Sequence, residues 1–269
     1  MAEADFPGGR LLVAVALRVM TFNLRRDVPA DGPHAWPHRE EAAANLVARQ
    51  APDVLGTQEG LPHMLRALDA RLPHMRRVGG CRRGDGTDES TAIYYDARRL
   101  LLVATSDVWL SDTPEVPGSA SWGNRLPRMA TWARFTDAQS GASFTVVNTH
   151  LDHESEAARV ASARFLAQRF PDAILMGDFN AAPGEPVHAI LTETHVDALG
   201  AEPSHTFHGF TADARVRLDW ILVPSGMRVA ACSVVRERPD GRYPSDHDPV
   251  VADLALTTGP IAAWPRSPG

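Results

Sequence analysis

The sequence predicts an α/β fold in which two mixed β-sheets pack face to face and helices cover their outer sides. Three observations lead to this prediction. Short apolar runs of strand composition alternate with a few amphipathic segments. The strand-like runs outnumber the helical ones, and several follow one another directly. No Ser/Gly-rich linker or charge run divides the 269 residues, so we expect a single domain over 10–257 with mobile ends at 1–9 and 258–269.

The first half of the chain begins with strands and helices in alternation and then turns to strands alone. The first helix ends before Pro52, and Gly, Pro, Asp and Ser turns separate the later strands. We therefore expect, in order, strand 17–24, helix 39–50, buried strand 54–57, helix 61–72 and strands 91–95, 100–110 and 130–135.

The second half repeats this rhythm. A long amphipathic segment lies between two strands, and a turn containing proline precedes a short helix. We expect strand 143–150, helix 154–170, buried strand 173–176, helix 187–193 and strands 218–223, 228–235 and 250–256.

The charge composition excludes several classes of function. All 27 basic residues are arginine, so a Schiff-base lysine, a P-loop lysine and a lysine general base are impossible. The formal net charge of −6 argues against tight binding to bulk nucleic acid. Four arginines, at 76, 77, 82 and 83, surround Gly79 and Gly80, where a solvated hairpin is favoured over a phosphate clasp.

The cysteines and the N-terminus bear on cellular location. Cys81 and Cys232 form neither a metal-binding pair nor a disulfide framework, which favours a reducing compartment. The apolar run 11–17 follows acidic rather than basic residues and is too short for the core of a signal peptide. No stretch is long enough to span a membrane. We therefore expect a cytoplasmic protein, and a role of the apolar run 11–17 in export stays open.

Polar side chains gather where the predicted strands end. Six buried polar strand ends are hard to explain separately, because an unpaired buried carboxylate costs several kcal/mol. Convergence on one cleft that holds a metal ion removes this cost. The segments are Thr21–Arg25, Thr57–Gly60, Asn148–His153, Met176–Asn180, Arg217–Ile221 and Ser245–Pro249.

The types of ligand indicate which metal such a cleft would bind. Carboxylate and amide oxygens suit a hard divalent cation, Mg²⁺ or Mn²⁺, rather than a thiolate-bound zinc ion. Strand geometry places Asp178 and Asn180 on one face, where the pair is suited to hold a water molecule. His247 with Asp219 makes an imidazole supported by a carboxylate, as in many acid–base sites.

In this order and over nearly the whole chain, these motifs resemble the endonuclease/exonuclease/phosphatase superfamily. The Gly-Asp-Phe-Asn and Ser-Asp-His motifs carry the resemblance in combination. The chain is similar in particular to bacterial metal-dependent hydrolases of unassigned substrate. The resemblance implies a four-layer α/β sandwich and in-line attack of water on phosphorus.

The resemblance also implies roles for individual residues. Glu59 resembles the principal metal ligand, with Asn23 beside it, and Asp246 is similar to a further carboxylate on the metal side. The number of ions, one or two, stays open.

For the reaction itself, the resemblance implies that Asp178 activates the attacking water and that Asn180 orients it. Asp219 and His247 resemble the pair that contacts the scissile phosphate. His150 matches the histidine that stabilises the phosphate or assists the leaving group. Which residue is the true base stays open.

Further residues are candidates for binding the substrate. Most are guanidinium or aromatic groups that lie close to the catalytic motifs or in a loop before a strand. They are Arg25, Trp122, Asn124, Arg125, Arg128, Asp152 and His153.

Our first hypothesis for the function is a phosphoesterase that acts on a small organic phosphate monoester or diester, as a monomer. The alternative is a DNA or RNA nuclease of the same superfamily, which predicts a contiguous arginine surface and salt-dependent binding. A lipid phosphodiesterase is disfavoured, since no apolar hairpin suits a membrane. A non-catalytic binding module is disfavoured because Asp178, Asn180 and His247 are all present. A binuclear metallophosphatase is excluded because no Gly-Asn-His block follows Asp178.

Overall fold

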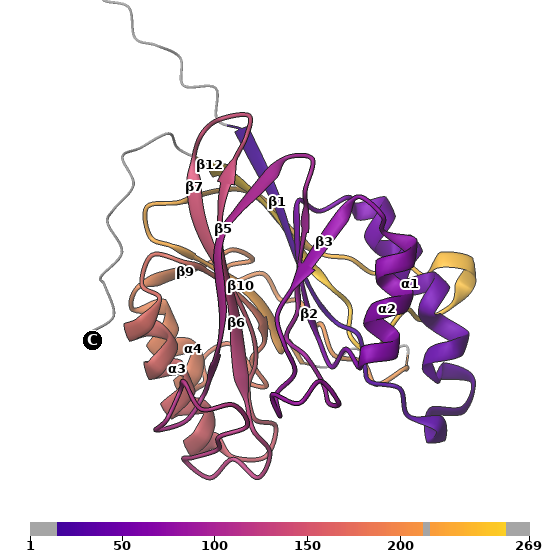
Figure 1. Cartoon of the computed structure of the whole chain (residues 1–269), viewed down its shortest axis with the longest axis horizontal. Coiled ribbons are helices and arrows are strands. Elements are labelled where there is room, and N and C mark those ends of the chain that lie inside the picture. Colours follow the sequence, from indigo (N-terminus) through magenta and orange to yellow (C-terminus); the bar gives the residue numbers. More distant parts are fainter. Residues whose placement is uncertain (1–14, 212–215, 257–269) are drawn as a thin grey trace, which may run out of the picture.

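The protein is a sandwich of two β-sheets with a pair of helices on each outer side, as a computed structural model of residues 15–211 and 216–256 shows (Figure 1). Each sheet has six strands and is mixed. Four layers follow one another: helices, sheet, sheet, helices. The expected fold class is therefore confirmed. The expected mobile ends, 1–9 and 258–269, lie outside the described residues.

The first sheet is built from both ends of the chain. Its central pair, β1 and β2, is parallel, and every other pair is antiparallel. In spatial order its strands are β11 (Arg228–Val234), β12 (Val250–Leu256), β1 (Val15–Asn23), β2 (Val54–Gln58), β4 (Ile93–Asp96) and β3 (Met75–Val78).

The second sheet follows the same plan, again with one parallel pair at its centre, β7 and β8. Its strands in spatial order are β5 (Leu100–Trp109), β6 (Met129–Asp137), β7 (Ser143–His150), β8 (Ile174–Asp178), β10 (Asp219–Pro224) and β9 (His195–Asp197). In each sheet a helix connects the two parallel strands, as a parallel crossover requires.

The helices begin at local signals in the sequence. Three of them, α1 (Trp36–Gln50), α2 (Pro62–Arg71) and α4 (Pro186–Thr192), have proline in the first two positions, where no backbone N–H is needed. The fourth, α3 (Glu156–Arg169), begins at Ser155, whose hydroxyl oxygen accepts a hydrogen bond from the Ala158 N–H. Two short 3₁₀ turns, Pro29–His34 and Pro239–Gly241, complete the described elements.

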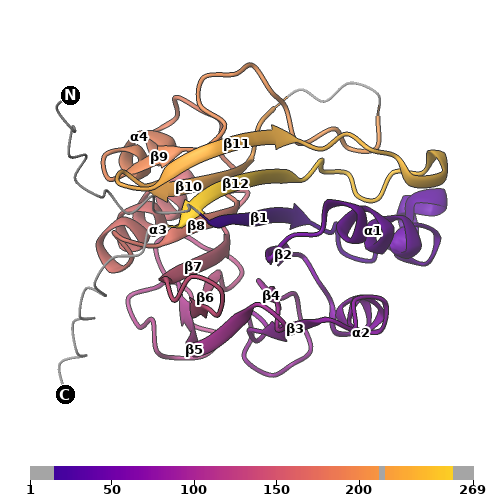
Figure 2. The same cartoon turned by 90° about the horizontal axis from the view of Figure 1, so that it is seen from above.

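Three apolar clusters hold the layers together. One lies between the sheets and includes Val19, Phe135 and Ile221. A second packs α1 and α2 on the first sheet, and a third packs α3 and α4 on the second. Figure 2 shows the two helix pairs on opposite sides of the sheets. Apolar burial on both faces of both sheets explains why most strands read as continuous apolar runs.

Most expected bounds agree with the structure to within two residues, and three differences are larger. Strands β3 and β9 were not expected, because β3 contains two arginines and β9 is only three residues long. Helix α1 begins at Trp36, three residues before the expected start. In the described part of the chain no helix has the length and apolar character needed to cross a bilayer.

Candidate active site

A cleft of about 510 Å³ lies where the carboxyl ends of the parallel strands of both sheets meet. Glu59 follows β2, His150 ends β7 and Asp178 ends β8, and all three line the cleft. Asp246 and His247, in the loop before β12, line it from the other side. The expected convergence of polar strand ends on one cleft therefore holds for the described structure.

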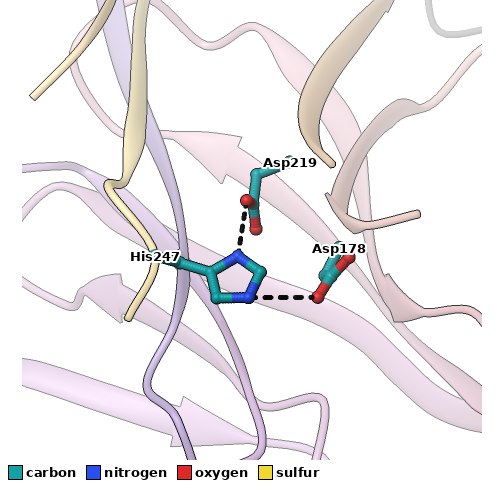
Figure 3. A group of neighbouring side chains, drawn as sticks. All are labelled: Asp178, Asp219 and His247. Atoms are coloured by element: carbon teal, nitrogen blue, oxygen red, sulfur yellow. Dashed lines mark hydrogen bonds and ion pairs between the residues drawn. The ribbon is translucent and has the colours of Figure 1, made fainter. Parts of the chain in front are cut away.

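Two aspartates and a histidine form a buried cluster in this cleft (Figure 3). Asp178 and Asp219 are directly paired residues of β8 and β10, so their side chains lie on the same face of the sheet. The His247 imidazole lies between them, with Nδ1 2.8 Å from Asp219 Oδ2 and Nε2 3.8 Å from Asp178 Oδ2. Burial disfavours the imidazolium, but the Asp219 carboxylate outweighs it and raises the pKa of His247 to about 10.

Asp178 is the most highly connected carboxylate of the site. Its Oδ2 accepts a hydrogen bond of 2.9 Å from Asn23 Nδ2, and its Oδ1 accepts one of the same length from the Asn180 N–H. His150 Nε2 lies 3.6 Å from Oδ2. Burial, together with the neighbouring Asp219, raises the pKa of Asp178 to about 7. A carboxyl group with such a pKa is suited to exchange protons near neutral pH.

His150 and Asn180 are held close to Asp178 by the backbone. His150 pairs with Asp178 in the parallel register of β7 and β8. Burial and the Arg128 cation lower the pKa of His150 well below its usual value, so its imidazole is neutral at pH 7. Asn180 has a φ of 47°, and its Nδ2 donates to the Leu151 carbonyl oxygen at 3.0 Å. A non-glycine residue in this left-handed conformation is held there by its surroundings.

Glu59 and Asp246 lie on the other side of the cleft. Glu59 Oε1 accepts a hydrogen bond from Asn23 Nδ2 at 3.0 Å, and Oε2 accepts one from the Arg26 N–H at 2.9 Å. Burial opposes ionisation of Glu59, but these two hydrogen bonds outweigh it and lower its pKa. Burial and the Glu59 charge raise the pKa of Asp246. Asn23 thus links the two sides of the site, since its amide contacts both Glu59 and Asp178.

The donor set fits a divalent cation. Asp178 and Asp246 bring two buried carboxylates to one cleft and Glu59 brings a half-buried one, and Oδ1 of Asp219 is buried without a hydrogen-bond partner in the described structure. Oxygen donors of this kind suit Mg²⁺ or Mn²⁺. The His247 imidazolium offsets one of the charges of Asp178 and Asp219, and the Arg25 guanidinium, 3.7 Å from Asp246 Oδ2, offsets one on the Glu59 and Asp246 side.

The expected substrate-binding residues divide into two groups. Three of them line the cleft: Arg25, Arg128 and His153. Asp152 lies behind Arg128, with its Oδ2 3.4 Å from Arg128 Nε. The remaining three do not line the cleft: Trp122 donates to Asp112, Asn124 donates to the Leu110 carbonyl oxygen, and Arg125 is exposed beside Glu154.

One wall of the cleft contains residues that the sequence did not single out as site residues. Glu89 is buried and its two carboxylate oxygens accept from Arg26 Nη1 and Arg82 Nη1, both at 2.8 Å. Arg82 is 6% exposed, so the expectation of a solvated hairpin is wrong at this position. Its burial follows from pairing with Asp88 and Glu89, six and seven residues later, and this acidic pair was the available signal. Phe207 also lines the cleft and packs on His247.

Comparison with known proteins identifies relatives that share both the sequence pattern and the fold. Residues 20–247 match the model of the endonuclease/exonuclease/phosphatase family. The crystal structure of an endonuclease/exonuclease/phosphatase from Bacteroides vulgatus is 30% identical, with a TM-score of 0.85, and the match covers 90% of this chain and 100% of that one. A mannosyl-6-phosphatase from Bacteroides thetaiotaomicron is 29% identical, with a TM-score of 0.83 and coverage of 89% and 100%.

A curated protein sequence matches over a shorter length. An uncharacterised protein of Acanthamoeba polyphaga mimivirus is 26% identical over 171 residues. This match covers 55% of the present chain and 60% of the viral protein. The viral relative therefore extends well beyond the region that the two proteins share.

Proposed function

The chain belongs to the endonuclease/exonuclease/phosphatase family, whose members hydrolyse phosphoester bonds, and we propose that it removes phosphate from the monoester of a small polyhydroxylated compound. The observation that carries this proposal is the pairing of charges in the cleft wall. The similarity to a mannosyl-6-phosphatase agrees with it.

The arginines of the cleft do not form a free cationic surface. Arg26 and Arg82 share Glu89, and Arg128 lies against Asp152. Arg25 lies 3.0 Å from Asp31 and 3.7 Å from Asp246. A polyanion such as DNA is bound by cationic groups that displace its counterions, and guanidinium groups already paired with carboxylates supply little of this attraction. The charge pattern thus favours a compact substrate over a nucleic acid.

The same wall suits hydroxyl groups. It presents guanidinium donors beside carboxylate acceptors, and a hydroxyl group accepts a hydrogen bond from a guanidinium and donates one to a carboxylate. Among the described residues that line the cleft, Phe207 is the aromatic residue besides the histidines, and its packing on His247, with 4.9 Å between ring centroids, makes it a poor platform for a stacked nucleobase. A sugar or similar polyol phosphate therefore matches the cleft better than a nucleotide.

The residues of the Asp178 side then have distinct roles in the proposed reaction. Asp178 accepts a proton from the attacking water, and Asn180 orients that water. His247, charged at neutral pH and supported by Asp219, donates to the phosphoryl oxygens. His150, neutral and close to Asp178, donates a hydrogen bond to the phosphate or the leaving group.

Glu59 and Asp246 are the residues that would hold the metal ion, with Asn23 fixing the position of Glu59. A Mg²⁺ or Mn²⁺ ion held by these residues would supply positive charge to neutralise the phosphate. We propose these two metals on the basis of the oxygen donors alone. One or two ions are compatible with the three carboxylates.

Location and assembly belong to the proposal as well. We propose a monomer in the reducing cytoplasm, an assignment supported by the free thiols of Cys81 and Cys232. Size-exclusion chromatography with light scattering tests the monomer.

A panel of substrates tests the proposed function. Initial rates are measured with Mg²⁺ or Mn²⁺ on hexose 6-phosphates, nucleoside monophosphates, an aryl phosphodiester, and single- and double-stranded DNA and RNA. The proposal expects the highest kcat/KM with a sugar or polyol monophosphate. A higher kcat/KM on the diester or on nucleic acid, falling steeply with salt, would contradict it and support the nuclease alternative.

A further inference from the structure

Arg39, in the first turn of α1, is a buried cation without a carboxylate partner. Its exposed fraction is 1%, and within the described residues no carboxylate oxygen lies within ion-pair distance of its guanidinium. The guanidinium carbon lies 5.1 Å from the ring centroid of Trp36 and 5.9 Å from that of Phe210. Burial lowers the pKa of Arg39 to about 10, so the group is charged at neutral pH.

Backbone carbonyl oxygens take the place of a carboxylate. Arg39 Nε donates to His34 at 2.7 Å, and Nη1 donates to Pro244 at 3.1 Å. Nη2 donates to Arg26 at 3.3 Å. Leu24 and Arg25 supply two further, shorter contacts. The five contacts use all five N–H donors of the guanidinium group.

Four of these five carbonyls, all but that of His34, belong to two loops that carry or contact the proposed metal ligands. Leu24–Arg26 follows Asn23, and the Arg26 N–H donates to Glu59. Pro244 directly precedes Ser245 and Asp246. The Ser245 hydroxyl donates to the Asn23 carbonyl oxygen at 2.6 Å, so the two loops also contact each other.

We propose that Arg39 is a positioning residue that holds these two loops together and thereby sets the affinity of the cleft for its divalent cation. The inference rests on the proposed function only in taking Glu59 and Asp246 as metal ligands. A planar guanidinium serves five carbonyls at once, four of them in the two loops, whereas a lysine ammonium has three donors and no planar face for Trp36. Groups behind metal ligands typically change metal affinity by 10–100-fold when they are replaced.

The test measures binding of Mn²⁺ alone, by electron paramagnetic resonance of the free ion, in wild type, Arg39→Ala and Arg39→Lys. We expect both variants to bind Mn²⁺ at least about tenfold more weakly. Arg99→Ala is the matched control, because Arg99 is a largely buried arginine at the opposite end of the sheets that contacts neither loop. It should leave the Mn²⁺ affinity within about twofold while lowering the thermal midpoint.

Rescue separates positioning from general damage to the fold. Arg39 lines a second cavity, of about 520 Å³, with His34, His38 and Tyr243. Free guanidinium at millimolar concentration should therefore enter Arg39→Ala and restore Mn²⁺ affinity, whereas urea, similar in shape but uncharged, should not. If Arg39→Ala fails to fold, Arg39→Lys carries the affinity test.

The outcomes are distinct. Wild-type Mn²⁺ affinity in folded Arg39→Lys, or in folded Arg39→Ala without guanidinium, overturns the inference. Weak binding that guanidinium restores supports it. If wild type binds Mn²⁺ and loses it on replacement of Arg39, yet hydrolyses none of the phosphate monoesters, the proposed function fails while the inference stands.

Discussion

At the end of the sheets that carries the cleft, the buried Asp178 lies beside a second carboxylate, that of Asp219, whereas at the opposite end the buried Asp137 lies beside an arginine. There Arg99 joins the two sheets, with Nη1 2.7 Å from Asp53 Oδ2 and Nε 3.1 Å from Asp137 Oδ1. Burial opposes the charge on Asp137, but Arg99 and Ser140 outweigh burial and lower its pKa. In the cleft, burial and a like charge raise the pKa of Asp178 to about 7.

The difference separates an end of the sheets where charged pairs stabilise the fold from an end where buried groups are available for reaction. Both ends place charged residues at strand ends, as Asp53 and Glu59 do on either side of β2, so a position at a strand end does not distinguish them. The balance of charge does: paired groups favour the folded state, while crowded carboxylates disfavour it until a proton or a cation binds. The comparison can be tested by removing one group from each end.

The largest effect is expected for Asp178→Asn. Replacing the proposed base should lower kcat by about 10²–10⁴-fold. In the metal-free protein the same change should raise the free energy of unfolding, because it removes a buried carboxylate crowded by Asp219. Steady-state kinetics and urea denaturation measure the two effects. A near-normal kcat of Asp178→Asn, or a clearly lower free energy of unfolding, would contradict the view that Asp178 is a crowded, reactive carboxylate.

Removal of the metal is expected to abolish activity reversibly. Treatment with a chelator should reduce the rate to background, and Mg²⁺ or Mn²⁺ in excess should restore it, because the carboxylate side of the cleft then regains its charge balance. Rates before and after dialysis check this. A protein that hydrolyses its best substrate equally well with the chelator present would rule out the metal-dependent scheme.

A substitution at the opposite end of the sheets, beside Arg99, should change the free energy of unfolding and not kcat. Asp137→Asn removes one of the two carboxylate partners of Arg99, whose side chain is largely buried, and leaves only Asp53. The substitution should lower the free energy of unfolding by about 3 kcal/mol at pH 7. Because the pKa of Asp137 is lower in the folded state, its contribution is present above the unfolded pKa and is lost as pH falls through the folded pKa. The variant should therefore show a weaker loss of stability in acid.

Urea titrations of wild type and Asp137→Asn between pH 2 and 7 measure this effect. The value of kcat should stay within about twofold of wild type, since Asp137 lies at the end of β6 away from the cleft. Equal acid sensitivity in the two proteins would show that the pairing with Arg99 contributes nothing.

The smallest effect is expected from an arginine just outside the cleft. Arg125→Ala removes an 82% exposed side chain beside Glu154 and should raise KM by less than about threefold. Arg128→Ala is the matched variant, because Arg128 is buried in the cleft wall, and should raise KM by tenfold or more. Similar KM values for the two variants would contradict the division of substrate-binding residues drawn from the structure.

Sequence patterns predicted most of the fold because the strands are buried on both faces and their apolar runs are unambiguous. Residues 143–150 are the clearest case, since the expected and observed bounds of β7 coincide. Strand β3 escaped notice because Arg76 and Arg77 interrupt the apolar pattern, and only its pairing with β4 makes it a strand. Tertiary pairing of this kind has no local signature.

The site was predictable to a similar degree, and for a similar reason. Residues at strand ends, such as Asp178 and Glu59, converge because the topology brings those ends together, and their motifs lie in short segments. Arg82 and Glu89 were not recognised because they line the cleft from a loop, and a loop's path is not encoded in periodicity. Arg39 was missed because its partners are backbone carbonyls of distant segments.

The cleft takes its walls from both sheets, with Glu59 and Asp246 on one and His150 and Asp178 on the other. A ligand that fills it therefore fastens the two sheets together, and its binding energy adds to the stability of the whole molecule. At one hundred times its Kd such a ligand contributes about 2.7 kcal/mol, which corresponds to roughly 5–10 °C in Tm for a chain of this size. Thermal-shift screening of Asp178→Asn against a library of metabolites thus offers a route to the natural substrate that requires no turnover.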